Sequence, residues 1–302
     1  MSQPDLTKML LMIKNGIDKT QPLIKQIEEL RKSKVVVLFC GDDSIDYIMC
    51  YRLLKILRQL GTVEKLDLFI DSGGGDIDAA CKMVKILKQY SKNFSILIPY
   101  MAKSAATLLA LNAEEVVMCK AGELGVADPQ VREPITGIYV PAHSIKEAID
   151  FIEEIKDPYV KLSMADKLPP LLIGAFRDAQ SASKQYVEES LSKLASNKEE
   201  ATHMFTQKYL SHGYPIDRDL CKQAGLNVVF PSEELEKKLG DLFEVYGDIM
   251  LNATSNFKVK SFSVIQANSN LCVTINGNDI TSRFKAFEGQ IELGSETSGE
   301  QS

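Results

Sequence analysis

The feature that most constrains the fold is a repeated order of strand, turn and helix in the first half of the chain. Four short apolar runs, rich in β-branched residues, each end in a turn, and helical patterns follow the first three. The runs are Lys34–Cys40, Leu66–Ile70, Ser95–Ile98 and Glu115–Cys119. Strands that alternate with helices at this spacing predict an α/β fold with a mostly parallel sheet. In such folds, functional groups gather at the carboxyl ends of the strands.

The remaining patterns predict further segments around this core. Apolar residues recur at helical spacing near the N-terminus, and a second helical region extends from about 143 to 210. Beyond about 252 the chain is rich in Asn, Ser and Thr, and Asn276-Gly277 is typical of a two-residue hairpin turn. We expect a helical segment, a main domain with a helical C-terminal half, a small β appendage and a disordered tail, at 1–33, 34–252, 253–293 and 294–302.

Charge and composition exclude several functional classes. The 302 residues carry a formal net charge of -6, so the chain lacks the basic surface that nucleic-acid binding requires. No stretch approaches the ~20 apolar residues of a membrane span, and no signal-peptide pattern is present. The six cysteines form no CxxC pair. We therefore expect a cytoplasmic protein without a membrane span or a nucleic-acid partner.

Two turns carry the candidate catalytic residues. The strand Leu66–Ile70 runs into Asp71-Ser72-Gly73-Gly74-Gly75, and a later turn of small residues holds Ser104 at the start of an apolar helix. Glycines let backbone N–H groups approach a ligand closely. We predict that Ser104 is a nucleophile, and that the N–H groups of Gly74, as the main donor, and Ala105 stabilise an oxyanion.

The two turns together resemble the ClpP/crotonase superfamily, in which an Asn-Ser-Pro-Gly-Gly loop precedes an Ala-Ser-X-Gly nucleophile turn. The closer resemblance is to the serine dehydrogenase proteinase family, relatives of signal peptide peptidase A, and covers roughly residues 34–230. Further similar segments are Gly122–Gln130, Val140-Pro141-Ala142 and His212–Ile216. The resemblance implies a ClpP/crotonase-like spiral of strand–turn–helix units and an oligomeric serine peptidase that needs no metal or cofactor. Peptides or proteins would be its substrates.

The general base is not fixed by the sequence. Relatives of signal peptide peptidase A use a lysine roughly forty to fifty-five positions after the serine, and Lys146 and Lys161 fall in or near that range. Such a lysine must be buried to lower its pKa toward neutrality. We favour Lys146 over Lys161. Asp128 is a possible orienting residue, while His212 is predicted to have a structural role in its turn.

Two other functions remain compatible with these residues. A crotonase-type enzyme would use similar oxyanion donors on an acyl-CoA thioester, although no basic cluster near the glycines suits a pyrophosphate. A catalytically silent oligomeric binding module on the same fold is the second alternative. The leading hypothesis is a serine peptidase that forms an acyl-enzyme on Ser104 with a lysine as the base.

Overall fold

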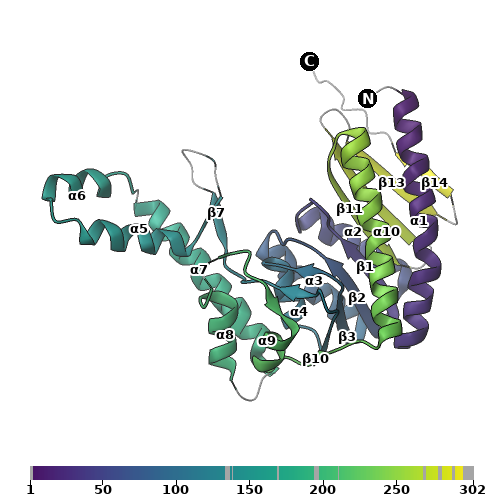
Figure 1. The fold of residues 1–302 in the computed structure, drawn as a ribbon, viewed down its shortest axis with the longest axis horizontal. Coiled ribbons are helices and arrows are strands. Elements are labelled where there is room, and N and C mark those ends of the chain that lie inside the picture. The colour runs from purple at the N-terminus through teal and green to yellow at the C-terminus, as the bar shows by residue number, and fades with distance from the viewer. Residues whose placement is uncertain are drawn as a thin grey trace.

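The fold has three layers, a central sheet with helices on both faces, and a helical arm that projects from it (Figure 1). The computed structural model describes residues 3–132, 137, 139–168, 170–193, 197–209, 211–267, 270–277, 281–287 and 290–294. The α/β fold predicted from the strand–turn–helix units is confirmed.

Strands and helices alternate through the first part of the chain, helices predominate in the middle, and strands end it. The helices are α1 Gln3–Arg31, α2 Tyr47–Leu60, α3 Ile77–Tyr90, α4 Ala105–Leu111, α5 His143–Glu154, α6 Pro158–Ala165, α7 Pro170–Ser190, a 3-10 turn Leu191–Lys193, α8 Lys198–Thr206, α9 Arg218–Gln223 and α10 Glu233–Phe257. The first strands are β1 Lys34–Phe39, β2 Val63–Asp71, β3 Ser91–Ile98, β4 Met101–Ala102, β5 Glu115–Met118 and β6 Glu123–Leu124. The later strands are β7 Gln130–Arg132, β8 Tyr139–Pro141, β9 Ile216–Asp217, β10 Val228–Val229, β11 Val259–Ala267, β12 Asn270–Gly277, β13 Thr281–Phe287 and β14 Gln290–Gly294.

One half of the large sheet is parallel and the other half is antiparallel. Its strand order is β10-β5-β3-β2-β1-β11-β12-β13-β14. The five strands from β10 to β1 run parallel, as the crossover helices between them require. The carboxyl ends of β1, β2 and β3 therefore lie at one edge, and the glycine-rich loop follows β2 at that edge.

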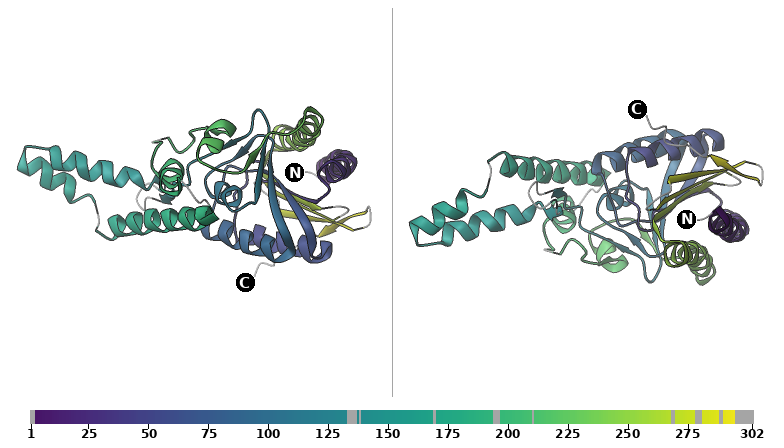
Figure 2. Two further views of the ribbon diagram at one scale, coloured as in Figure 1. Left: turned by 90° about the horizontal axis from the view of Figure 1, so that it is seen from below. Right: turned by 90° about the horizontal axis from the view of Figure 1, so that it is seen from above.

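Alternate residues of the parallel strands pack into two separate cores. In β1, Val36 and Leu38 face the core beneath α2, α3 and α4, whereas Val35 and Val37 face the core beneath α1 and α10. Figure 2 shows α1 and α10 on one side of the sheet and α2 and α3 on the other. Burial on both faces explains why these strands are almost continuously apolar in sequence.

The C-terminal strands extend the main sheet. β11 pairs antiparallel with β1, and β12, β13 and β14 follow as consecutive antiparallel neighbours. The predicted hairpin is present between β12 and β13, but Asn276 pairs with Thr281. The chain therefore reverses after Asn276 rather than at the predicted Asn276-Gly277 turn. Most of the predicted disordered tail, residues 295–302, lies outside the described residues.

A buried polar network joins β11 to the two helices on its face. The Tyr246 hydroxyl donates to the Gln266 side-chain oxygen at 2.6 Å, and the Gln266 amide donates to the Thr20 hydroxyl at 2.9 Å. All three side chains are fully buried. Because each polar group has a partner, the network stabilises the packing of α1, α10 and β11 together.

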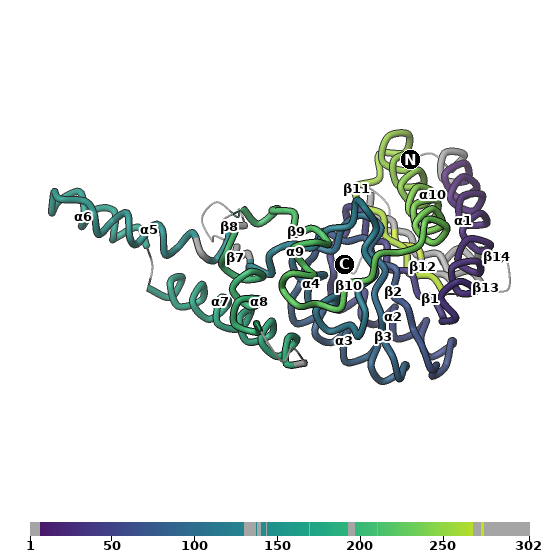
Figure 3. The backbone as a smooth tube through the Cα atoms, turned by 60° about the horizontal axis from the view of Figure 1, so that its bottom comes forward, coloured from purple at the N-terminus to yellow at the C-terminus, as the bar shows by residue number. Residues whose placement is uncertain are grey.

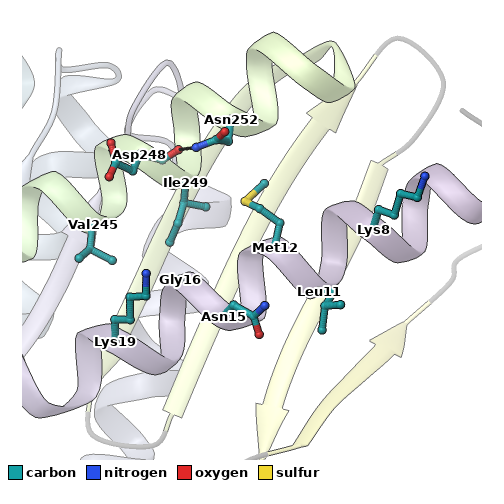
Figure 4. Close-up of a pocket in the computed structure, with 10 residues that line it drawn as sticks. All are labelled: Lys8, Leu11, Met12, Asn15, Gly16, Lys19, Val245, Asp248, Ile249 and Asn252. Atoms are coloured by element: carbon teal, nitrogen blue, oxygen red, sulfur yellow. Dashed lines mark hydrogen bonds between the residues drawn. The ribbon is translucent and has the colours of Figure 1, made fainter.

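Helix α1 packs lengthwise against α10. Its C-terminal Arg31 donates from Nε to Asp67 on β2 at 2.8 Å and also pairs with Glu115 on β5. Farther along, the two helices border an open groove of about 470 Å³, in which Lys19 and Asp248 flank the apolar Ile249 and Met12 (Figure 4). The ion pairs therefore fix one end of α1 to the sheet, and beside the groove Gly16 lies so close to α10 that a Cβ on it would be 2.5 Å from the Ile249 side chain.

Helices α5 and α6, with the start of α7 that follows them, form an arm that extends away from the sheet (Figure 3). No residue of α6 is buried, and large apolar side chains are exposed along the arm. The most exposed of these are Tyr159 at 84%, Leu162 at 70% and Leu171 at 91%. Within the described part of the chain, every helix is too short or too polar to cross a membrane.

Candidate active site

Two backbone hydrogen bonds hold the glycine-rich loop against the turn that carries Ser104. The Ser72 N–H donates to the Met101 oxygen at 3.1 Å, and the Lys103 N–H donates to the Ser72 oxygen at 2.9 Å. These bonds form a short parallel bridge between Ser72 and Ala102. The two turns that the sequence analysis singled out are therefore neighbours in space.

Ser104 is held in a strained backbone conformation. Its φ of +51° lies in the left-handed region, which residues with a side chain rarely adopt. Although Ser104 occupies the N-cap position of α4, its hydroxyl makes no capping hydrogen bond, and within the described residues it has no hydrogen-bond partner. Strain of this kind costs about 1–3 kcal/mol and is concentrated at functional sites.

The turn is braced from behind by Thr107. Its buried hydroxyl lies 2.9 Å from the Ala102 oxygen and 3.0 Å from the Gly125 oxygen. It also accepts a hydrogen bond from the Gly125 N–H at 3.1 Å. These contacts fix the start of α4 to the loop after β6, so the conformation of Ser104 is maintained by its surroundings.

Two of the three consecutive glycines have no room for a side chain. A Cβ on Gly74 would lie 2.6 Å from the Cβ of Ser104, and a Cβ on Gly75 would lie 2.3 Å from the backbone oxygen of Ile45. Their φ values are +111° and +148°, so a side chain would also be strained. Gly73 is different, because nothing lies within 4 Å of the position of its Cβ.

The backbone N–H groups beside Ser104 differ in whether they already donate a hydrogen bond. The Gly74 N–H already donates to the Ser72 hydroxyl at 3.1 Å, which conflicts with its predicted role as the main oxyanion donor. The N–H groups of Gly75 and Ala105 make no hydrogen bond to any residue that the structure describes. The amides of Gly75 and Ala105 thus remain available for a ligand.

These residues line one cavity of about 820 Å³. Its wall includes Gly73, Gly74, Gly75, Ser104 and Ala105. Asp128, which is 4% exposed, and the half-buried His212 line the same cavity. Asp42, Asp43 and Asp76 contribute further carboxylates to its lining.

The two candidate lysines lie on the arm and do not line this cavity. Lys146, on α5, is 74% exposed and pairs with Asp150 at 3.8 Å. Lys161, on α6, donates to the Glu153 oxygen at 2.9 Å in an exposed position. The burial that a neutral lysine base requires is absent at both positions in the single chain. Their assignment stays a prediction.

The Lys103 side chain lies in a buried site behind the turn and does not line the cavity. Its ammonium lies 2.6 Å from the Glu123 carboxylate and 3.3 Å from the Gly213 and Tyr214 oxygens. It also donates to the Leu124 oxygen at 3.4 Å. Lys103 therefore connects the Ser104 turn to the segment that contains His212.

His212, for which the sequence predicted a structural role, lines the cavity. It comes from a segment more than one hundred residues after Ser104, and the small sheet β4-β6-β9 brings the two together, with Ile216 paired to Leu124. The only signal in the sequence was that His212–Ile216 belongs to the segments that carry the family resemblance. The separation of His212 from Ser104 along the sequence gave no indication that His212 lies at the cavity.

Asp71, which precedes the glycines, is a buried carboxyl whose Oδ1 has no hydrogen-bond partner among the described residues. Burial raises its pKa to about 7, opposed by a hydrogen bond from the Met101 backbone. The superfamily pattern has Asn at this place, and a protonated Asp has nearly the same shape. The group is thus able to remain neutral beside the site.

The raised pKa of Asp71 predicts a pH-dependent stability. The folded state retains a proton that the unfolded chain releases near pH 4, so the free energy of unfolding should fall as the pH rises from about 4 to about 7. At 1.36 kcal/mol per pH unit, the loss approaches about 4 kcal/mol. Asp71→Asn should remove this contribution and raise stability at pH 8, as measured by urea unfolding. An unchanged pH dependence in the variant would contradict the assignment.

The family described as ClpP-like SDH-type serine proteinases matches residues 6–268. Two uncharacterized proteins of Methanocaldococcus jannaschii are 26% and 27% identical to the chain over 249 and 236 residues. These matches cover 78% and 74% of this chain, and 79% and 77% of the relatives.

Two solved structures show an overall likeness. The 1510-N membrane-bound stomatin-specific protease is 18% identical, with a TM-score of 0.44, over 68% of this chain and 84% of that chain. ClpP1 from Listeria monocytogenes is 12% identical, with a TM-score of 0.39, over 69% of this chain and 98% of that chain.

Proposed function

Because the chain belongs to the family of ClpP-like SDH-type serine proteinases, we propose that it hydrolyses peptide bonds through an acyl-enzyme on Ser104. The observation that carries the proposal is the shared cavity of Ser104 and the glycine-rich loop. The backbone at Ser104 is strained, and its hydroxyl is not used for helix capping. These features fit a nucleophile better than a structural serine.

In the proposed reaction, the Ser104 oxygen attacks the carbonyl carbon of a peptide bond, and a base at the cavity accepts the hydroxyl proton. The N–H groups of Gly75 and Ala105 donate to the oxyanion that forms, which replaces the predicted main role of the Gly74 amide. Gly74 instead provides the space that lets the loop contact the serine. Collapse of the tetrahedral intermediate releases the amine product, and water then hydrolyses the ester.

Labelling with a serine-reactive phosphonate tests the proposal directly. The wild-type chain should form a covalent adduct, and peptide mapping by mass spectrometry should place it on Ser104. The Ser104→Ala variant should not react. Labelling of both proteins to the same extent would remove Ser104 from the mechanism.

We also propose that the protein is a homo-oligomer and that the arm takes part in its assembly. Side chains such as Tyr159, Leu162 and Leu171 present apolar surface that would be stabilised by burial against a second copy. Leu171→Asp should shift the protein to a smaller assembly in analytical ultracentrifugation. The matched control is Leu251→Asp, at a position on α10 that is also exposed. Unchanged assembly of the Leu171 variant would exclude this role for the arm.

A further inference from the structure

We propose that Ser263, on β11, is a positioning residue for the reaction at Ser104, because it supports the loop that sets the place of the Gly75 N–H. The support passes through Asp43 and Ile45, in the loop that follows β1. This inference rests on the proposed function, since it concerns an oxyanion donor of the same reaction. Ser263 does not line the cavity, so it acts on the reaction through other residues.

The position of Gly75 is set by Ile45. The Ile45 N–H donates to the Gly74 oxygen at 2.8 Å, and the Ile45 oxygen accepts from the Asp76 N–H at 2.8 Å. These two bonds, one on each side of Gly75, form a short parallel bridge. The contact is close, because a Cβ on Gly75 would lie 2.5 Å from the Ile45 nitrogen. A shift of Ile45 therefore moves the N–H group that we assign to the oxyanion.

Asp43 fixes the loop that leads from β1 to Ile45. Its N–H donates to the Cys40 oxygen at 2.8 Å, which forms a turn directly after the strand. Its Oδ1 accepts from the Ser44 N–H at 3.0 Å. Asp43 thus lies in the middle of the connection, and it also lines the cavity. Because one residue separates it from Ile45, a change in the orientation of Asp43 displaces Ile45 as well.

Ser263 holds the second carboxylate oxygen of Asp43. Its hydroxyl donates to Asp43 Oδ2 at 2.9 Å, across 220 residues of sequence. Ser263 is 2% exposed and lies on β11, the antiparallel neighbour of β1. Within the described residues, Asp43 makes no ion pair, so the Ser263 hydroxyl is its one side-chain partner there. A hydrogen bond to a carboxylate is roughly twice as strong as one between neutral groups, which suits a contact that fixes a loop.

The backbone of β11 contacts the same loop. A Cβ on Gly41 would lie 2.6 Å from the Phe262 oxygen, and the φ of Gly41 is +53°. The loop therefore lies directly against the residue before Ser263, with no room for a side chain between them. A strand from the C-terminal part of the chain thus supports this loop at two adjacent residues, Phe262 and Ser263.

These contacts connect β11 to the cavity without a gap. The Ser263 hydroxyl binds the Asp43 carboxylate, the loop backbone continues to Ile45, and two hydrogen bonds join Ile45 to the glycine-rich loop around Gly75. Oxyanion stabilisation depends on donors that are in place before the reaction begins. A misplacement of about 1 Å in such a site lowers the rate by up to about 10²-fold. Loss of the Ser263 hydroxyl should therefore affect kcat more than substrate binding.

The experiment compares kcat, KM and the rate of phosphonate labelling for the wild type, Ser263→Ala and Ser263→Thr. We expect Ser263→Ala to lower kcat by about 10-fold to 10²-fold, with a smaller change in KM. Ser263→Thr keeps the hydroxyl and should retain most of the activity. Asp43→Ala should have an effect of similar size, and adding Ser263→Ala to it should change little more, since both substitutions remove one interaction.

Hydrogen exchange provides a readout that does not depend on catalysis. Exchange at the N–H groups of Ile45 and Asp76, which join the two loops, should be faster in Ser263→Ala than in the wild type. Thr274→Val is the matched control, since it removes a buried hydroxyl from the neighbouring strand β12 that contacts Arg52 on α2. It should leave the exchange rates and kcat near their wild-type values.

Faster exchange and lower kcat in Ser263→Ala, but not in Thr274→Val, support the inference. Unchanged exchange and kcat in Ser263→Ala would overturn it, and so would equal losses in Thr274→Val, because the effect would then be one of general stability. Failure of the wild type to react at Ser104 would instead refute the proposed function, while the exchange rates still test whether Ser263 holds Ile45 in place. Thermal unfolding of each variant measures how much of a loss is due to misfolding.

Discussion

Replacing Ser104 by alanine is expected to reduce peptide hydrolysis by about four to six orders of magnitude while the fold remains intact. Removal of the nucleophile in serine peptidases has effects of this size. The hydroxyl makes no hydrogen bond within the described residues, so its loss leaves no buried group without a partner. The initial rate of cleavage of an unfolded protein substrate, measured beside circular dichroism, checks both parts.

A glycine at position 104 provides the matched control. Glycine adopts the φ of +51° without the steric penalty that serine or alanine experiences. Ser104→Gly should therefore be as inactive as Ser104→Ala but more stable, by about 1 kcal/mol in the free energy of unfolding. Equal stability of the two variants would show that the backbone at 104 carries little strain. Residual peptidase activity near that of the wild type in either variant would exclude Ser104 as the nucleophile.

The second large effect is expected from Gly74→Ala. The new Cβ would lie 2.6 Å from the Cβ of Ser104 and 2.9 Å from the Lys103 oxygen, on a backbone with φ of +111°. The loop and the serine turn must then separate, which misplaces the Gly75 amide. Loss of one oxyanion donor lowers kcat by about 10²–10³-fold. We expect a loss of at least this size in kcat, with a smaller change in KM.

Gly73→Ala is the control that the chain itself offers. The residue is adjacent, exposed and outside the positive-φ region, and its Cβ would meet nothing within 4 Å. Its activity should stay within a few-fold of the wild type. If Gly73→Ala and Gly74→Ala have equal effects on kcat, the close approach of the loop to Ser104 has no catalytic significance.

The sequence was sufficient for the core of the fold because local patterns and burial agree there. The strand Lys34–Phe39 is apolar on both faces from Val35 onward, which is the pattern of a parallel sheet covered by helices. The N-caps of α9 and α10 are equally local, because the side chains of Asp217 and Ser232 accept from the N–H groups of Leu220 and Leu235, three residues further on. These features depend on residues close together in the chain.

The features that sequence could not provide depend on distant contacts. The hydrogen bond from the Gly74 N–H to the Ser72 hydroxyl depends on a single side-chain rotamer. The presence of His212 at the cavity depends on the pairing of Ile216 with Leu124, which no periodicity encodes. The exposure of Lys146 was equally out of reach, because it follows from α5 projecting away from the sheet.

The pairing of β1 with β11 has a consequence for how this protein folds during its synthesis. β1 lies beside the strand that leads into the glycine-rich loop, and on its other edge it pairs with residues from Val264 to Gln266. During synthesis, more than two hundred further residues must leave the ribosome before that edge is covered. Contacts so remote in the chain close slowly, and an uncovered strand invites association with other chains. The central sheet therefore stays incomplete at β1 until nearly the whole domain has been synthesised.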